Sequence, residues 1–482
     1  MLKEKKRNEV LIYQTTHLTT YMAAIKLKEK IGYGFGDFAS SMFWKILTMY
    51  LLFFYTDIFG LPAAAVGTMF LVTRFWDTIF DPLVGVVSDR TKSKWGKFRP
   101  YLLWIALPFG IIGTLMFITP SFGSTGKLIY AYATYSLMMM VYSSINVPYA
   151  SLLGVMSSDP KERNKLSSYR MVFAFIGSFV ALLLIDPLVQ FFKNIHHGNL
   201  QIAWTMGVMV IAVLCVLFFW GCFALTKERI KPISEKTRSL KADVKDLFAN
   251  RPWWILLGAG ISALIFNSIR DGAAVYYFKY YVQKDGMVQL PFIDLSLTLT
   301  TLYLVLGQAA NILGIILVTP FAGKIGKKWV YLTSMSVATI LSILFFFLNP
   351  HSIALMMILQ FFISMCAGSI FPLLWSMYAD IADFSEWKNN RRATGLIFSS
   401  SSMSQKFGWA IGGALTGWLL GFVGFHANVM QTTETLTGIR MMLSFFPAIG
   451  TALSVIFIAF YPLNEKKLMA IVSELNEQRK QL

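Results

Sequence analysis

Three ionisable side chains, Arg74, Asp77 and Asp81, lie in a stretch that is otherwise apolar. Their spacings of three and four residues place them on one stripe of a helix. Charged groups are costly in hydrocarbon, so within a membrane-spanning helix they face a protein interior or a water-filled path. A stripe with one cation and two carboxylates suits a coupling-ion site better than a surface that faces lipid. A buried ion-pair network that only locks helices together is the alternative.

The composition of the chain is that of a membrane protein. Of its 482 residues, 56% are hydrophobic and 14% are charged, whereas soluble proteins carry about 25% charged residues. Apolar stretches of the ~20 residues that cross a bilayer recur along the whole length. We predict about twelve spans, at 32–56, 61–87, 100–119, 127–154, 168–192, 201–225, 253–282, 293–319, 329–348, 352–379, 394–424 and 438–461.

Basic residues are concentrated in alternate loops between these spans. They cluster at 90–99, 161–165, 227–251, 324–328 and 388–392, while the loops on the other side carry few. This asymmetry follows the positive-inside rule, which places the basic loops and both termini in the cytoplasm. The net charge of +18 therefore orients the chain in a membrane and gives no reason to expect a nucleic-acid partner.

The two halves of the chain carry corresponding signals. The second predicted span ends with Pro82 and Gly85 before a basic loop, and the eighth ends with Pro320 and Gly323 before another. Parallel repeats of six spans with a charged central loop are typical of the major facilitator architecture. The tract Gly85-Val-Val-Ser-Asp89-Arg90 also resembles the Gly-x-x-x-Asp-Arg loop of that superfamily.

We therefore predict an all-α integral membrane protein with about twelve transmembrane helices in two pseudo-symmetric six-helix bundles. Its segments are a cytoplasmic N-terminal tail (1–31), an N-terminal bundle (32–226), a cytoplasmic central loop (227–252), a C-terminal bundle (253–461) and a cytoplasmic C-terminal tail (462–482). Such a protein would span the cell inner (cytoplasmic) membrane several times.

Longer motifs sharpen this resemblance. They are Tyr33-Gly-Phe-Gly-Asp37-Phe38, Tyr55-Thr56-Asp57, Arg74-Phe-Trp-Asp77-Thr-Ile-Phe-Asp81-Pro82, Lys94-Trp95-Gly96-Lys97-Phe98-Arg99-Pro100, Asn146-Val-Pro148-Tyr149 and Ala379-Asp380-Ile-Ala-Asp383-Phe384. Together they resemble the motifs of the glycoside–pentoside–hexuronide:cation symporters, the family of melibiose permease. The similarity runs from about Ile31 to about Tyr461.

The resemblance implies a cation-coupling site. The two aspartates that bind and couple the cation in melibiose-type members match Asp77 and Asp81, which would be metal ligands only if the ion is Na⁺. Ser143 matches a neighbouring threonine, and Lys406 matches an eleventh-span lysine that faces the aspartates. Lys406 could neutralise the aspartates in the absence of the cation. Its alternative role is a permanent interhelical salt bridge.

The resemblance also implies a sugar site. Arg170 matches a fifth-span arginine that hydrogen-bonds sugar hydroxyls, a role that suits its forked donors. Phe371 and Trp375 are candidates for stacking on a pyranose ring, although packing or lipid contact explains most aromatics in these spans and is the favoured alternative. The predicted substrate-binding residues are Asp37, Ser41, Tyr142, Asn146, Arg170, Phe371 and Trp375.

Several positions depart from the melibiose-type pattern. Ser41 and Asn146 each replace an aspartate, Ser40 replaces a lysine, Ala150 replaces a sugar-stacking tryptophan, and Phe80 replaces an asparagine. Each change removes an oxygen, a charge or a stacking surface from the melibiose-type site. Melibiose itself is therefore not the expected substrate, and a proton is favoured over Na⁺ as the coupling ion. Asp37 lies one turn before Ser41 and could replace some of the lost charge.

Other polar or small residues within the spans have structural explanations. The Arg270-Asp271 pair is interpreted as structural or gating, with lining of the sugar path as the alternative. The tyrosines at 276–281 fit an aromatic belt at the membrane interface. Gly408, Gly412 and Gly413 are expected to allow close approach of helices.

We expect a secondary active symporter that imports a glycoside, pentoside or hexuronide with H⁺ or Na⁺ by alternating access. Its expected partners are that sugar, the cation and the lipid bilayer, and no cofactor is expected besides the ion. A major facilitator carrier for another amphiphile, such as a lysolipid or drug, is the alternative. The sequence pairs no nucleophile with a base and contains no Walker-type loop, so an enzyme is not expected.

Overall fold

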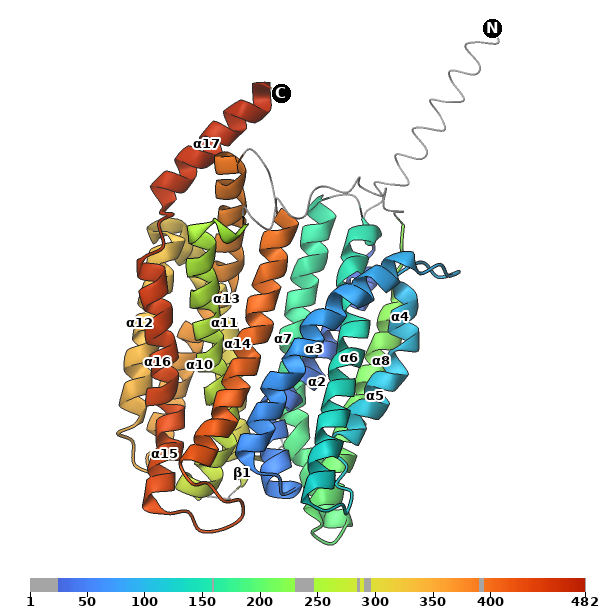
Figure 1. Cartoon of the computed structure of the whole chain (residues 1–482), viewed down its shortest axis with the longest axis vertical. Coiled ribbons are helices and arrows are strands. Elements are labelled where there is room, and N and C mark those ends of the chain that lie inside the picture. The colour runs from blue at the N-terminus through green and yellow to red at the C-terminus, as the bar shows by residue number, and fades with distance from the viewer. Residues whose placement is uncertain are drawn as a thin grey trace. The chain divides into compact units, whose positions relative to one another are not determined.

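The computed structural model describes residues 25–157, 160–229, 247–283, 287–289, 296–389 and 394–481. Most of the predicted N-terminal tail and of the predicted central loop lie outside these ranges. The described chain is almost entirely helical (Figure 1). Its one described sheet is a hairpin of β1 (Met287–Gln289) and β2 (Ser296–Thr298), in which Val288 pairs with Leu297.

The helices follow the predicted spans in order. They are α2 (Leu27–Phe53), the π-helical η1 (Phe54–Ile58), α3 (Ala63–Arg90), α4 (Arg99–Trp104), α5 (Ala106–Leu115), α6 (Ser124–Met156), α7 (Pro160–Ile195), α8 (Leu200–Leu225), α10 (Arg251–Tyr276), the π-helical η2 (Tyr277–Val282), α11 (Leu299–Ile325), α12 (Lys327–Phe345), α13 (Ile353–Asn389), α14 (Thr394–Phe422), α15 (Thr433–Leu443), α16 (Phe445–Ala459) and α17 (Glu465–Gln481).

The prediction of an all-α membrane protein is confirmed. Nine of the described helical stretches are long and apolar enough to cross a bilayer. The apolar helices Ala63–Arg74 and Arg99–Leu115 correspond to the second and third predicted spans, and α14 corresponds to the eleventh. The third and twelfth spans are each divided into two helices, α4 with α5 and α15 with α16.

The eighth and tenth predicted spans had inaccurate ends. Helix α11 begins at Leu299, after the predicted start at 293, because Ser296–Thr298 pair with β1 and the Thr298 side chain then accepts from the Thr301 N–H as an N-cap. Helix α13 continues to Asn389, ten residues beyond the predicted end at 379. Hydropathy marks only the apolar part of a helix, and the last turns of α13 are polar.

Contacts divide the chain into two compact units whose boundaries fall within three helices, α2, α3 and α6. Unit 1 comprises residues 1–45, 76–120 and 129–235, and unit 2 comprises 46–75, 121–128 and 236–482. The N-terminal part of α2, up to residue 45, and the C-terminal part of α3, from residue 76, therefore belong to unit 1. The rest of both helices, with the loop that connects them, belongs to unit 2. The predicted six-helix halves follow the chain order, and their boundaries stay a prediction.

Helix α14 packs through glycines on two of its faces in unit 2. A Cβ on Gly417 would lie 2.5 Å from the Ala63 carbonyl oxygen and 2.8 Å from Gly67 Cα on α3. On the other face, a Cβ on Gly408 or Gly412 would lie 2.6 Å or 2.4 Å from side-chain atoms of α10. Small residues four apart allow such close helix contacts in membranes, as the sequence led us to expect.

In unit 1, a carboxylate holds the start of α4. Glu228, which follows α8, accepts hydrogen bonds from the backbone N–H groups of Lys97, Phe98 and Arg99 at 2.9, 2.7 and 2.9 Å. The Arg99 guanidinium donates in return to the Phe223 carbonyl near the end of α8, at 2.7 Å. Each helix end thus receives the charge that its unpaired backbone groups favour.

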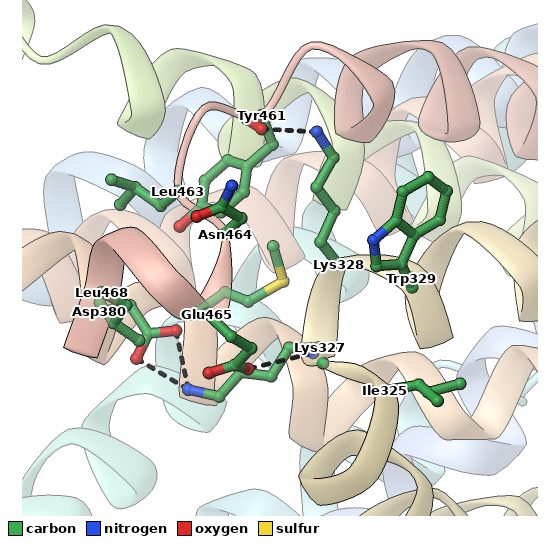
Figure 2. A pocket seen from close by; sticks show the side chains of 12 residues that line it. Ile325, Lys327, Lys328, Trp329, Asp380, Tyr461, Leu463, Asn464, Glu465 and Leu468 are labelled. Carbon is green, nitrogen blue, oxygen red and sulfur yellow. Dashed lines mark hydrogen bonds and ion pairs between the residues drawn. The ribbon is translucent and has the colours of Figure 1, made fainter. Parts of the chain in front are cut away.

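Unit 2 contains the same joint at the repeat-related position. Glu465, which follows α16, accepts from the backbone N–H of Lys327 at 3.3 Å. The Lys328 ammonium donates to the carbonyl oxygens of Ala459 and Tyr461 at 2.9 and 2.7 Å, and Figure 2 shows the bond to Tyr461. The internal symmetry that the basic loops indicated therefore extends to individual hydrogen bonds.

Candidate transport site

Asp77 and Ser143 meet in unit 1, as the family resemblance implied. The Ser143 hydroxyl on α6 donates to Asp77 Oδ1 on α3 at 2.8 Å. Both residues are buried, with 4% and 2% of their surface exposed. Asp81 lies one turn further along α3 and is partly buried. The two carboxylates therefore share a helix face, and α6 supplies a neutral oxygen to the first of them.

Arg170 is held by Asp37 in a two-point ion pair. The Arg170 Nε and Nη2 atoms on α7 donate to Asp37 Oδ2 and Oδ1 on α2, at 2.5 and 3.2 Å. The side chains remain 26% and 17% exposed, so the pair is accessible. Both residues were predicted to bind the sugar, but their mutual contact was not predicted.

Two tyrosines that sequence reasoning did not select line this ion pair. The guanidinium of Arg170 lies 4.8 Å from the ring of Tyr149 and 5.7 Å from the ring of Tyr33. Each tyrosine hydroxyl donates to the backbone carbonyl of the other tyrosine, at 2.7 Å from Tyr149 and 3.4 Å from Tyr33. Their places in the first and fifth quoted family motifs were the available signal. Cation–π contacts of this kind help to fix a guanidinium in one orientation.

Ser40 and Asn146, two positions that depart from the melibiose-type pattern, are in contact. The Ser40 hydroxyl donates to Asn146 Oδ1 at 2.7 Å, and Asn146 Nδ2 donates to the Tyr142 carbonyl at 3.0 Å. The family resemblance implied a lysine and an aspartate at these positions in melibiose-type members. In this chain a neutral hydrogen bond joins the two positions.

The remaining predicted residues of unit 1 lie on the same helices. Ser41 is partly buried on α2, where its carbonyl accepts from Ser178 Oγ at 3.5 Å. The ring of Tyr142 packs 5.2 Å from the ring of Trp44 and 6.3 Å from that of Phe109. Tyr142 therefore belongs to an aromatic cluster, which holds α6 against α2 and α5.

Three predicted site residues belong to unit 2. Phe371 and Trp375 are partly buried one turn apart on α13, and Lys406 is partly buried on α14. Phe371 packs against the hydrophobic core of this unit, which favours packing as the role of its ring. Its stacking on a sugar, like the roles of Trp375 and Lys406, stays a prediction.

Arg270 has a structural role within unit 2. Its buried guanidinium donates to the hydroxyl of Tyr303 at 2.6 Å, to Gln360 Oε1 at 2.7 Å and to the carbonyl of Leu443. Leu443 is the last residue of α15, where the chain breaks before α16. Arg270 thus satisfies a backbone acceptor that the broken helix leaves unpaired.

A cavity of about 310 Å³ in unit 2 contains none of the predicted site residues. It lies between the start of α12, the end of α13 and the linker before α17. Figure 2 shows the Lys327 ammonium directed at both oxygens of Asp380, at 2.8 and 2.7 Å. Lys327, Lys328 and Glu465 are all engaged in the joint between α12 and α16, so this cavity belongs to a structural contact.

Comparison with known proteins identifies the family. The family described as MFS/sugar transport protein matches residues 32–465. The inner membrane symporter YicJ of Escherichia coli is 34% identical over 95% of this chain and 96% of its own length. The isoprimeverose transporter of Lactiplantibacillus pentosus is 34% identical, over 94% of this chain and 93% of its own.

Solved structures share the fold. The nucleoside transporter NupG has a TM-score of 0.58 with 15% identity, covering 90% of this chain and 99% of its own. A bacterial homologue of the lysosomal transporter Spinster has a TM-score of 0.63 with 13% identity, covering 93% and 97%. The chain is a multi-pass membrane transporter and not an enzyme, and it belongs to the glycoside–pentoside–hexuronide symporter family of the major facilitator superfamily.

Proposed function

We propose that this protein imports a glycoside, pentoside or hexuronide together with a cation, by alternating access. The observation that carries the proposal is the pairing of two polar sites within unit 1. Asp77 and Ser143 provide a buried carboxylate site on α3 and α6, while Asp37 and Arg170 provide an accessible donor–acceptor pair on α2 and α7. Ion and sugar groups on neighbouring helices can influence each other's binding, as symport requires.

Arg170 and Asp37 suit recognition of sugar hydroxyls. A guanidinium offers several donors in one plane, and a carboxylate accepts from adjacent hydroxyls. The ion pair supplies both kinds of group and stays partly exposed. Ser41 lies on α2, and Asn146 and Tyr142 lie on α6, as parts of this site or its support. Phe371 and Trp375 remain candidates for sugar stacking, on the resemblance alone.

We favour H⁺ over Na⁺ as the coupling ion. A metal cation needs several oxygen ligands, whereas a proton needs only one carboxylate. The positions of Ser41, Asn146 and Phe80 each lack an oxygen or charge that melibiose-type members have there, and Asn146 is engaged with Ser40. Protonation of Asp77 or Asp81 would then couple the ion to the sugar. A coupling role for Lys406 rests on the family resemblance.

The orientation follows from the basic loops. The positive-inside rule places the joints at Glu228 and Glu465, together with both termini, in the cytoplasm. The opposite helix ends, which include η1 and η2, then face the outside of the cytoplasmic membrane. A relative that is named inner membrane symporter supports this location.

Counterflow of labelled sugars in proteoliposomes tests the proposal. The panel would contain isoprimeverose, an aryl glucuronide, α- and β-xylosides, galactosides and 2,3-dihydroxypropane-1-sulfonate, because relatives bear names of several of these classes. Imposed H⁺ and Na⁺ gradients would be compared separately. We expect uptake of one sugar class that an inward H⁺ gradient accelerates. Transport of lysolipids or drugs without transport of any sugar, by folded protein, would instead establish the amphiphile carrier.

A further inference from the structure

The side chain of Asp57 is completely buried in unit 2 and carries several short hydrogen bonds. Lys279 Nζ donates to its Oδ1 at 2.6 Å, and Thr56 Oγ1 donates to its Oδ2 at 2.7 Å. The hydroxyl of Tyr280 also donates to Oδ1. A buried carboxylate needs such compensation, because an unpaired charge in the protein interior is strongly destabilising.

The groups around Asp57 come from repeat-related helix ends. Asp57 lies on η1, which ends the first span, and Lys279 and Tyr280 lie on η2, which ends the seventh. The first and seventh spans open the two six-helix repeats. Both therefore end in a π-helical turn, a rare conformation that is frequent at functional sites. Neither π-turn was expected from the sequence, although Tyr55-Thr56-Asp57 had been noted as a family motif.

A third segment closes the network. Asn428, between α14 and α15, has a left-handed backbone with φ of 60°. Its Nδ2 donates to the Asp57 carbonyl at 2.7 Å, its backbone N–H donates to the Tyr280 hydroxyl at 2.9 Å, and its Oδ1 accepts from Lys279 at 2.9 Å. One short loop thus bonds to both π-helical turns.

Further contacts join the same helix ends. Thr56 shares a hydrogen bond of 2.8 Å with the Tyr276 hydroxyl, and Tyr50 shares one of 3.0 Å with Thr301. The glycine contact between α3 and α14 lies in the same unit. All these bonds connect residues 46–75 to residues beyond 270, so they tie the ends of the first two spans to helices of the second repeat.

We infer that Asp57, Lys279 and Asn428 form a latch that holds the outer end of the transport path shut and must break for it to open outward. The inference rests on the proposed alternating access. In the open state, the Asp57 and Lys279 charges are separated and stabilised by water. In the closed state they stabilise each other, whereas a half-open state would leave a buried charge without its partner. A network with only two favourable arrangements is what a gate between two conformations requires.

Disulfide formation at a nearby pair measures closure without any transport. A Cβ on Gly421 of α14 would lie 3.0 Å from Ala64 Cβ of α3, within reach of a disulfide after a small adjustment. The test variant Ala64→Cys with Gly421→Cys would be oxidised in detergent, and the cross-linked peptide would be quantified over time by mass spectrometry. The rate would then be compared in the backgrounds Asp57→Asn, Lys279→Gln and Glu434→Gln.

We expect Asp57→Asn and Lys279→Gln each to slow cross-linking by about fivefold or more, the lower end of a typical coupling between sites. Glu434→Gln, like Asp57→Asn, replaces one acidic side chain with its amide, but at an exposed position of α15. It should therefore leave the cross-linking rate unchanged. The charge exchange Asp57→Lys with Lys279→Asp should recover part of the rate.

Cross-linking at the parent rate in Asp57→Asn and Lys279→Gln would overturn the latch. If Asp57→Asn is not recovered as folded protein, Lys279→Gln and Asn428→Ala give the same comparison. Because the readout is proximity, failure of the latch is distinguishable from failure of sugar transport in the counterflow assay. If Asp57→Asn and Lys279→Gln slow the cross-linking but the protein transports no sugar, the latch would be supported and the proposed sugar symport would be rejected.

Discussion

At the scale of residues, unit 1 contains two polar pairs, which we propose as the ion site and the sugar site. Asp77 has Ser143 as its neutral partner, while Asp37 neutralises Arg170 across 133 positions of sequence. The quoted family motifs contain Asp37 and Asp77, and the resemblance to melibiose-type members added Ser143 and Arg170. Neither could show that Asp37 and Arg170 bind each other, because a contact between α2 and α7 is set by the packing of whole helices.

Asp81→Asn should abolish uphill accumulation of sugar while part of the sugar exchange survives. An amide cannot take up and release a proton at neutral pH, so the ion gradient loses its point of action. Active uptake and equilibrium exchange would be measured on the same proteoliposomes. Accumulation at the wild-type level would show that Asp81 does not couple the ion.

Asp37 and Arg170 should be thermodynamically coupled in sugar binding. Each of Asp37→Asn and Arg170→Gln should weaken sugar binding by about tenfold or more, because one change leaves a charge without its partner. The double variant should lose less than the product of the single losses. Half-saturation of counterflow gives the affinities. Strictly multiplicative losses would mean that the ion pair does not act as a unit.

At the scale of elements, each repeat uses the same joint between its third and sixth spans. The basic loops of the sequence indicated this symmetry, and the structure adds the acidic residue that follows each sixth span. Gly96 and Gly326 have φ of 112° and 89° at these joints, which a residue with a side chain rarely adopts. The carboxylates were not predicted, because a single Glu in a polar tract carries no local signal.

Glu228→Gln should destabilise unit 1 by about 1 to 3 kcal/mol, since three backbone N–H groups lose a charged acceptor. Thermal unfolding in detergent would be compared with Glu434→Gln, which removes an exposed acid of α15 that should matter little. Equal unfolding temperatures for the two variants would contradict the role of Glu228 at the start of α4.

The stability that Glu162 contributes at the start of α7 should fall in acid. Hydrogen bonds from Lys165 and Lys30 lower the pKa of Glu162 from 4.5 to about 2, with N–O distances of 2.8 Å in both pairs. A lowered folded-state pKa contributes stability that is complete above pH 4.5 and is lost as the pH falls towards 2. The excess stability of wild type over Glu162→Gln should therefore shrink through this window. A difference in melting temperature that is constant from pH 6 to pH 3 would argue against it.

At the scale of the whole molecule, local hydropathy was enough to predict the order and number of the spans. It misplaced the start of the eighth, where Ser296–Thr298 form a strand, since pairing with Met287–Gln289 is not a local property. The π-helical turns η1 and η2 were also missed, because their hydrogen bonds to Asn428 come from a distant loop. The features predicted from the sequence are marked by periodic hydrophobicity or by family motifs, and the features that were missed depend on tertiary contacts.

The alternating-access account makes sugar and ion movement inseparable. Once counterflow has identified a transported sugar, its addition to de-energised proteoliposomes should draw protons inward with it. An electrode in a weakly buffered medium records this directly. Asp81→Asn serves as the control, because it should exchange sugar without moving protons.

Sugar-induced alkalinisation of the external medium is therefore the decisive test of proton-coupled symport. We expect a rise in external pH on addition of the sugar, which a protonophore abolishes and which Asp81→Asn lacks. Sugar entry with Na⁺ uptake and no change in pH would show that Na⁺, and not H⁺, is the coupling ion. Sugar entry with neither ion would contradict symport itself.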